Sequence, residues 1–162
     1  YLFILLYQRI PTPEEFFKQY QICYQRDAYQ LGSVGEVSEE VIKARLYRAY
    51  PSLIRDIHFY TLCSGDPRFD DVKYSTEVDK QGVDLIVSRG GERFAVRLHN
   101  SSEAASNWAK TKEVAGSFSA VIDIVLDNPN RIGCFNLYND QSLDYLAAAM
   151  DVAIGEKLDN AN

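Results

Sequence analysis

The dipeptide Gly90-Gly91 between two apolar runs constrains the fold more than any other feature of the sequence. The runs are residues 83–87 and 94–99, and Arg89 and Glu92 flank the glycines. A hairpin with a two-residue turn needs positive φ angles at its centre, which glycine adopts at no steric cost. We therefore expect two antiparallel strands joined by a tight turn.

Helical patterns precede this hairpin. Thr12 supplies a hydroxyl N-cap, Pro13 takes the first helical position and Glu15 lies three residues after the cap, which is typical of a helix start. Ser38 caps a second helix, whose apolar stripe is interrupted by Pro51. Either the second helix kinks at Pro51 or two helices meet there, and we favour the kink.

Further strands are expected on both sides of the hairpin, over residues 72–78 and 134–138. Residues 120–126 form a nearly continuous apolar run, which is typical of a strand covered on both faces. A helix should run from Asn100 or Ser101 to about residue 114, and another should follow Asp140.

This order predicts an α/β fold with a mixed central sheet flanked by helices. At 162 residues the chain suits a single domain. Within it we expect an N-terminal helical extension (1–36), a core (37–127), and a final strand with a C-terminal helix (128–162).

Cysteines and hydropathy indicate a reduced, cytoplasmic protein. Cys23, Cys63 and Cys134 are odd in number and widely spaced, so they predict neither a disulfide framework nor a zinc site. The apolar opening, residues 1–7, is far shorter than the roughly 20 residues of a membrane span. We expect no membrane partner.

Charge is distributed unevenly along the chain. Residues 1–60 hold seven Lys/Arg and seven Asp/Glu, whereas residues 61–162 hold ten against sixteen. An acidic second half is a poor general surface for nucleic acid, whose binding depends on neutralising phosphates. A local basic groove remains compatible with that balance. The only basic concentration consists of Lys43, Arg45, Arg48 and Arg55, which either contact a DNA backbone or form a solvated helix face.

The expected order αβββαβ, over residues 38–127, resembles the core of the PD-(D/E)XK (restriction-endonuclease-like) nuclease superfamily. That superfamily carries an acid on the second core strand and (D/E)-x-K on the third. Asp84 looks like the first acid, and Ala95-Val96-Arg97 stands where (D/E)-x-K would be. The resemblance implies a divalent-metal-dependent endonuclease using Mg²⁺ or Mn²⁺, with Asp84 as a metal ligand.

The two replacements bear on whether this chemistry survives. Ala95 cannot bind a metal, and Arg97 contacts a phosphate but stays protonated and cannot act as a base. The resemblance allows the missing acid to move to Glu77, Glu40 or Glu103, with Glu77 the preferred second metal ligand. His99 is a further candidate ligand or base.

Structural explanations stand beside these functional ones. Asp84 forms a salt bridge with Arg97 if it binds no metal, because an unpaired carboxylate in an apolar strand is costly. His99 packs in the fold, and Glu77 solvates a strand end. Asp123, inside the apolar run, is expected to be the buried partner of an arginine.

Two functions follow from these residues. The first is a nuclease-like domain of a DNA-processing or mobile-element protein, with catalysis altered or lost. The second is a protein-interaction domain on the same scaffold, favoured by the acidic second half and by eleven tyrosines, a residue type enriched at interfaces. DNA and protein are therefore both expected partners.

Overall fold

The computed structural model describes residues 9–31, 39–74, 78, 82–100, 114, 116–133 and 135–159. The chain divides into two compact units, Tyr1–Ile54 and Arg55–Asn162. Within the described ranges, no helix has both the length and the apolar character needed to cross a membrane.

The first unit contains α2 (Pro13–Leu31) and the beginning of α3 (Glu39–Gly65). The backbone N–H of Glu15 donates to the Thr12 hydroxyl over 3.2 Å, and the N–H of Thr12 donates to the Glu15 carboxylate over 2.8 Å. A hydrogen-bonded ion pair with Arg9 lowers the pKa of Glu15 to about 2. The predicted helix start is confirmed, as a reciprocal capping box.

Aromatic side chains fix α3 to α2 within this unit. The buried Tyr50 donates its hydroxyl to the carbonyl of Pro11, and its ring centroid lies 5.6 Å from that of Phe16. The α3 helix runs through Pro51 without ending, so the alternative of two separate helices is wrong. The division between the two units falls within α3, shortly after Pro51.

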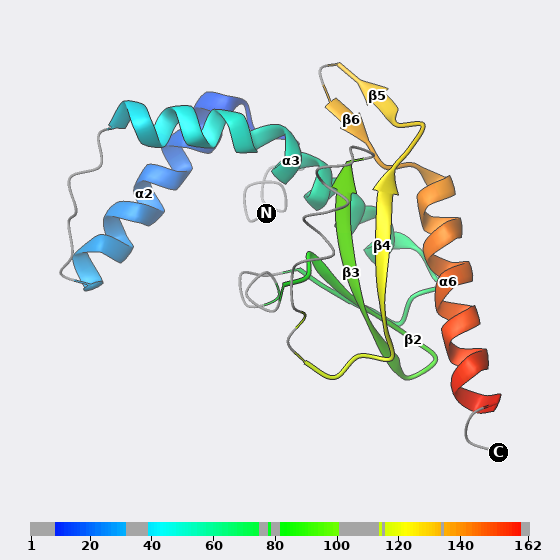
Figure 1. Cartoon of the computed structure of the whole chain (residues 1–162). Coiled ribbons are helices and arrows are strands. Elements are labelled where there is room, and N and C mark those ends of the chain that lie inside the picture. The colour runs from blue at the N-terminus through cyan, green and yellow to red at the C-terminus, as the bar shows by residue number, and fades with distance from the viewer. Residues whose placement is uncertain are drawn as a thin grey trace. The chain divides into compact units, whose positions relative to one another are not determined.

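A four-stranded mixed sheet forms the centre of the second unit, as predicted (Figure 1). Its strands, in spatial order, are β1 (Asp71–Lys73), β2 (Leu85–Arg89), β3 (Glu92–Asn100) and β4 (Ala120–Leu126). The pairs β1–β2 and β2–β3 are antiparallel, whereas β3 and β4 are parallel.

The β2–β3 connection is the hairpin that the sequence predicts. Arg89 pairs with Glu92, and Gly90 and Gly91 have φ angles of 59° and 78°. Positive values at both central positions define the primed turn that matches the twist of the strands.

The main core lies on one sheet face, against α6 (Asp140–Asp159) and the end of α3. A smaller cluster covers part of the opposite face around Ile86 and Ala95. The main cluster includes a set of apolar strand residues and a set from α6: Leu85, Val87, Phe94, Val96, Leu98, Ile122, Ile124 and Leu126, with Leu143, Leu146, Ala147 and Met150.

Three expectations need correction. The β4 strand is not covered on both faces, because Val121 and Val125 are exposed while the residues between them are wholly or partly buried. The strand expected over 72–78 is shorter in the described part, where β1 ends at Lys73. The third concerns the strand expected over 134–138, which is present over 135–137 but lies outside the four-stranded sheet.

That strand, β6 (Phe135–Leu137), pairs with β5 (Asn130–Ile132) in a separate two-stranded sheet. All three residues of β5 are exposed, so the sequence has no apolar alternation there from which to predict it. The helix expected from residue 100 or 101 to about residue 114 falls almost wholly outside the described residues.

Replacing Gly91 tests the hairpin. An added Cβ would meet no atom within 4 Å, so the cost of Gly91→Ala comes from the positive φ alone. We expect a loss of about 1 kcal/mol in the free energy of unfolding, measured by urea denaturation. Gly65→Ala is the matched control, because Gly65 also has open space but no positive φ. Equal effects of the two substitutions would contradict the turn geometry.

Candidate functional site

Asp84 lies immediately before β2 and is bound to the backbone of β3. Its N–H donates to the carbonyl of Val96 over 2.9 Å, and its Oδ2 accepts the N–H of Leu98 over 2.7 Å. The half-buried carboxylate therefore extends the β2–β3 ladder at this end. The sequence predicted the neighbourhood of Asp84 and β3, but not this backbone contact.

Arg97 and Asp123 form a bidentate ion pair across β3 and β4. The parallel register places them opposite each other, with Nε to Oδ1 at 2.8 Å and Nη2 to Oδ2 at 2.9 Å. The Arg97 side chain is 14% exposed and that of Asp123 is 40% exposed. Asp123 is thus the partner of an arginine, as expected, and it takes the ion pair for which Asp84 was the other candidate.

Ala95 and His99 lie on the same side of β3 as Arg97, because side chains alternate along a strand. Ala95 is fully buried in the small cluster with Val83 and Ile86. The Nδ1 atom of His99 is 3.2 Å from the carbonyl of Asn100, and its Nε2 is 3.6 Å from Oδ1 of Asp123. The second distance exceeds a hydrogen bond, so His99 adds only a charge contact when it is protonated.

The described residues do not fit a divalent metal. Nowhere among them do three His, Cys, Asp or Glu side chains converge. One Asp84 oxygen accepts a backbone N–H, both Asp123 oxygens accept Arg97, and Ala95 offers no donor. Mg²⁺ needs an octahedral set of oxygens, and the described residues do not bring such a set together. Glu77 and Glu103, the candidate replacements, lie outside the described residues.

The remaining predicted residues belong to the first unit. Glu40 is exposed in the first turn of α3. Lys43 packs its ammonium over the rings of Phe17 and Tyr47, at 5.6 and 5.5 Å from their centroids. Lys43 is therefore engaged with aromatic side chains. Arg45 and Arg48 are also exposed, and their helical spacing puts them together on a different side of α3 from Lys43.

The sequence reasoning named Arg55 only as a basic residue that could contact DNA, and it missed the polar contacts that Arg55 makes near the end of β3. Arg55 donates from Nη1 to Oδ1 of Asn100 over 2.6 Å, and Tyr138 donates its hydroxyl to the carbonyl of Ile124 over 3.4 Å. Burial raises the pKa of Tyr138, so its hydroxyl remains a donor. Arg55 and Asn100 are 45 residues apart, and no local pattern in the sequence signals such a contact.

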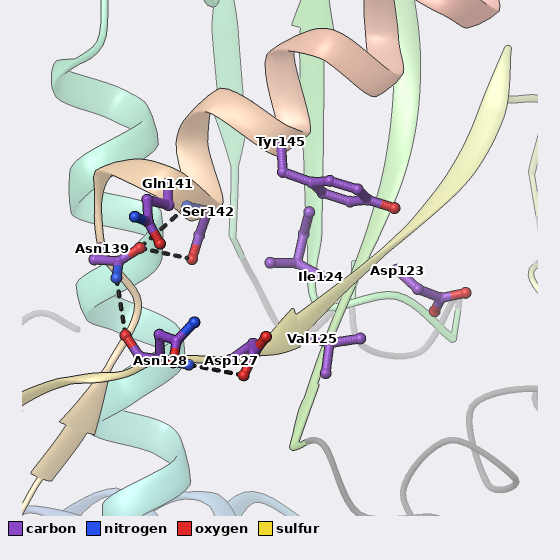
Figure 2. Close-up of a pocket in the computed structure, with 9 residues that line it drawn as sticks. All are labelled: Asp123, Ile124, Val125, Asp127, Asn128, Asn139, Gln141, Ser142 and Tyr145. Atoms are coloured by element: carbon purple, nitrogen blue, oxygen red, sulfur yellow. Dashed lines mark hydrogen bonds between the residues drawn. The ribbon is translucent and has the colours of Figure 1, made fainter.

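A cavity of about 340 Å³ lies along β4, at the start of α6 (Figure 2). Asn139 caps α6 by accepting the N–H of Ser142, and its Nδ2 donates to the carbonyl of Asn128. The cavity is lined by residues of β4, of the turn that follows and of α6: Asp123, Ile124, Val125, Asp127, Asn128, Asn139, Gln141, Ser142 and Tyr145. Of these, only Asp123 was singled out from the sequence.

Comparison with known proteins gives no family for this chain: no protein-family model, curated protein or solved structure matches it. The resemblance to PD-(D/E)XK nucleases therefore rests on the motif positions and the element order alone. Any assignment of function must come from the residues and contacts described above.

Removing the Asp123 charge tests the ion pair. Asp123→Asn removes the charge that Arg97 binds through two hydrogen bonds, and we expect a loss of about 1–2 kcal/mol in the free energy of unfolding. Asp71→Asn is the control, because its pair with Lys73 is 3.6 Å long and exposed on both sides. Urea denaturation measures the loss of stability in both variants. Equal losses would show that the Arg97–Asp123 ion pair stabilises the fold no more than an exposed pair does.

Cys63 provides a test of the core. Burial raises the pKa of its thiol to about 12, so very little thiolate exists at pH 8. Because the thiolate is the nucleophile, we expect native Cys63 to resist iodoacetamide while the partly exposed Cys23 reacts. Peptide mass spectrometry measures both sites. Comparable labelling rates in the native protein would contradict the burial of Cys63.

Proposed function

We propose that the unit Arg55–Asn162, with the preceding part of α3, is a nuclease-like domain of the PD-(D/E)XK type that has lost metal-dependent cleavage. The restriction-endonuclease-like core is part of this proposal. It is supported by a helix followed by three antiparallel strands and a fourth strand parallel to the third. It is supported also by Asp84 before β2, beside the strand that carries Ala95 and Arg97.

The main observation in favour of lost catalysis is the bidentate ion pair between Arg97 and Asp123. Cleavage by such an enzyme needs two carboxylates that hold a metal, which polarises the phosphate and lowers the pKa of the attacking water. Here the position of the second acid is a buried alanine, and the position of the lysine is an arginine already bound to a carboxylate. An arginine stays protonated and supplies no base.

The resemblance puts such a domain in a DNA-processing or mobile-element protein. Arg45 and Arg48 are exposed on α3 and are candidates for contact with a DNA backbone. Arg97 is a weaker candidate for that contact, since its guanidinium would have to leave Asp123.

Protein binding on the same scaffold is the second candidate function. Val125 and Tyr145 line the β4 cavity and are 42% and 58% exposed, and the neighbouring Val121 is 41% exposed. Apolar and aromatic side chains exposed together mark sites of interaction more often than do scattered ones.

A cleavage assay tests the first function. Supercoiled, linear and single-stranded DNA are incubated with the protein in Mg²⁺ or Mn²⁺, beside the variant Asp84→Ala. We expect no metal-dependent cutting by either protein, while an added metal-dependent nuclease cuts the same samples. Cutting that Asp84→Ala abolishes would overturn the loss of catalysis and turn attention to Glu77 and Glu103.

Restoring the motif tests the nuclease-like ancestry itself. In the double variant Ala95→Glu with Arg97→Lys, we expect Mn²⁺ to raise the Tm, because a ligand that binds only the folded state stabilises it. The matched control is Ala95→Gln with Arg97→Lys, which has the same shape without the carboxylate. A folded double variant with no more Mn²⁺ response than the control would count against a nuclease site at Asp84.

A further inference from the structure

In the part of the chain that the structure describes, β4 is one of the two outer strands of the sheet, and the other is β1, which has three residues. On one side β4 pairs with β3 over all seven residues, from Ala120 to Leu126. No other described strand pairs with it, and in Figure 1 α6 runs alongside. An outer strand leaves alternate backbone N–H and C=O groups available to another extended chain.

The edge lacks most of the features that prevent such pairing, although the carbonyl of Ile124 already accepts the Tyr138 hydroxyl. Proteins usually protect an edge with lysine, proline or a bulge, or by keeping the strand very short. The β4 strand has seven residues, of which six are apolar, and it contains no proline or lysine. Its one charged residue, Asp123, is held by Arg97. An extended, mainly apolar edge of this kind is suited to receive a strand.

The cavity beside this edge is acidic. Two carboxylates, those of Asp123 and Asp127, belong to its described lining. Arg97 is bound to Asp123, so the negative charge of this lining comes mainly from Asp127. The Asp127 carboxylate accepts only a hydrogen bond from the next residue, Asn128, among the contacts of the described chain. Figure 2 shows the ring of Tyr145 extending from α6 toward β4. An aromatic face next to carboxylates suits a cation.

We infer that the β4 edge binds an extended basic peptide, which adds to the sheet as an antiparallel strand. Valine-like side chains of the peptide lie against Val121 and Val125, and its basic side chains lie opposite Asp123 and Asp127. Backbone hydrogen bonds supply affinity in this mode of recognition, and the alternate side chains supply specificity. The inference names the partner class for the second candidate function, protein binding, and it rests on that function.

Charge favours a foreign basic strand over a second copy of this chain. An antiparallel pair of two β4 strands centred on Asp123 would bring the two Asp123 carboxylates opposite each other. Like charges directly across a strand pair are destabilising, whereas opposite charges and paired valines stabilise it. A peptide with lysine at that position replaces the repulsion by attraction.

The probe is an eight-residue peptide designed to match this face. It carries lysine, valine, lysine and valine at positions one, three, five and seven, with threonine between them, and a fluorescein label. We expect saturable binding by fluorescence anisotropy. Replacing both lysines by glutamate should weaken binding by about tenfold or more, because attraction becomes repulsion. Two further peptides lose backbone donors by N-methylation: one at its threonines, the other at its lysines and valines. At least one of the two should bind about tenfold more weakly, because its N–H groups can no longer donate to β4.

Two pairs of variants locate the site. Val125→Lys puts a like charge against the peptide and should weaken binding by about tenfold, whereas Ile132→Lys, a change at an exposed residue of β5 outside the cavity, should leave it unchanged. Asp127→Asn should weaken binding by about threefold, and Asp159→Asn, at the end of α6, should not. Circular dichroism checks that each variant folds.

The inference fails if the glutamate peptide binds as well as the lysine peptide, or if Val125→Lys and Ile132→Lys bind it equally. It also fails if the protein forms dimers that exclude the peptide and that Val125→Lys dissociates, since the occupant is then a second copy. None of these variants alters Asp84, Ala95 or Arg97. Failure here therefore leaves the nuclease-like proposal intact, and a positive DNA cleavage assay leaves the peptide result intact.

Discussion

The parallel pairing of β3 with β4 is the interaction on which the second unit depends. It extends the antiparallel β1–β2–β3 set into a four-stranded sheet and brings Ile122, Ile124 and Leu126 into the core beneath α6. The same register sets Arg97 opposite Asp123, where two short hydrogen bonds join their charges. A mostly buried guanidinium requires such a partner, since an unpaired charge there would be strongly destabilising.

This pairing also limits what the site can do. A carboxylate bound to an arginine through both oxygens, and another bound to the N–H of Leu98, are poorly prepared to hold a metal. The residues on which the proposed nuclease-like motif rests here make contacts within the sheet. Among the described residues, the outer strand β4 remains accessible, where exposed valines adjoin carboxylates and a tyrosine. Binding of a peptide to that edge requires no catalytic group.

Local features of the fold were predictable because their causes lie within a few residues. Gly90-Gly91 determines a turn through its φ angles, and Thr12 with Glu15 caps a helix through hydrogen bonds three residues apart. The partner of Arg97 was not predictable, because Asp123 is 26 residues away and Asp84 fitted the pattern equally well. Val121 and Val125 were expected to be covered, since apolar content alone does not distinguish an outer strand from an inner one.

The most direct test is a titration of ¹⁵N-labelled protein with Mn²⁺, whose unpaired electrons broaden nearby amide signals. If Asp84 and Arg97 are held as described, the amides of Asp84 and Leu98 broaden no more than that of Asp71, an exposed carboxylate in the same unit. Selective broadening at Asp84 and Leu98 at low Mn²⁺, lost in Asp84→Ala, would contradict this account. It would show a metal site where the structure places a backbone contact and an ion pair.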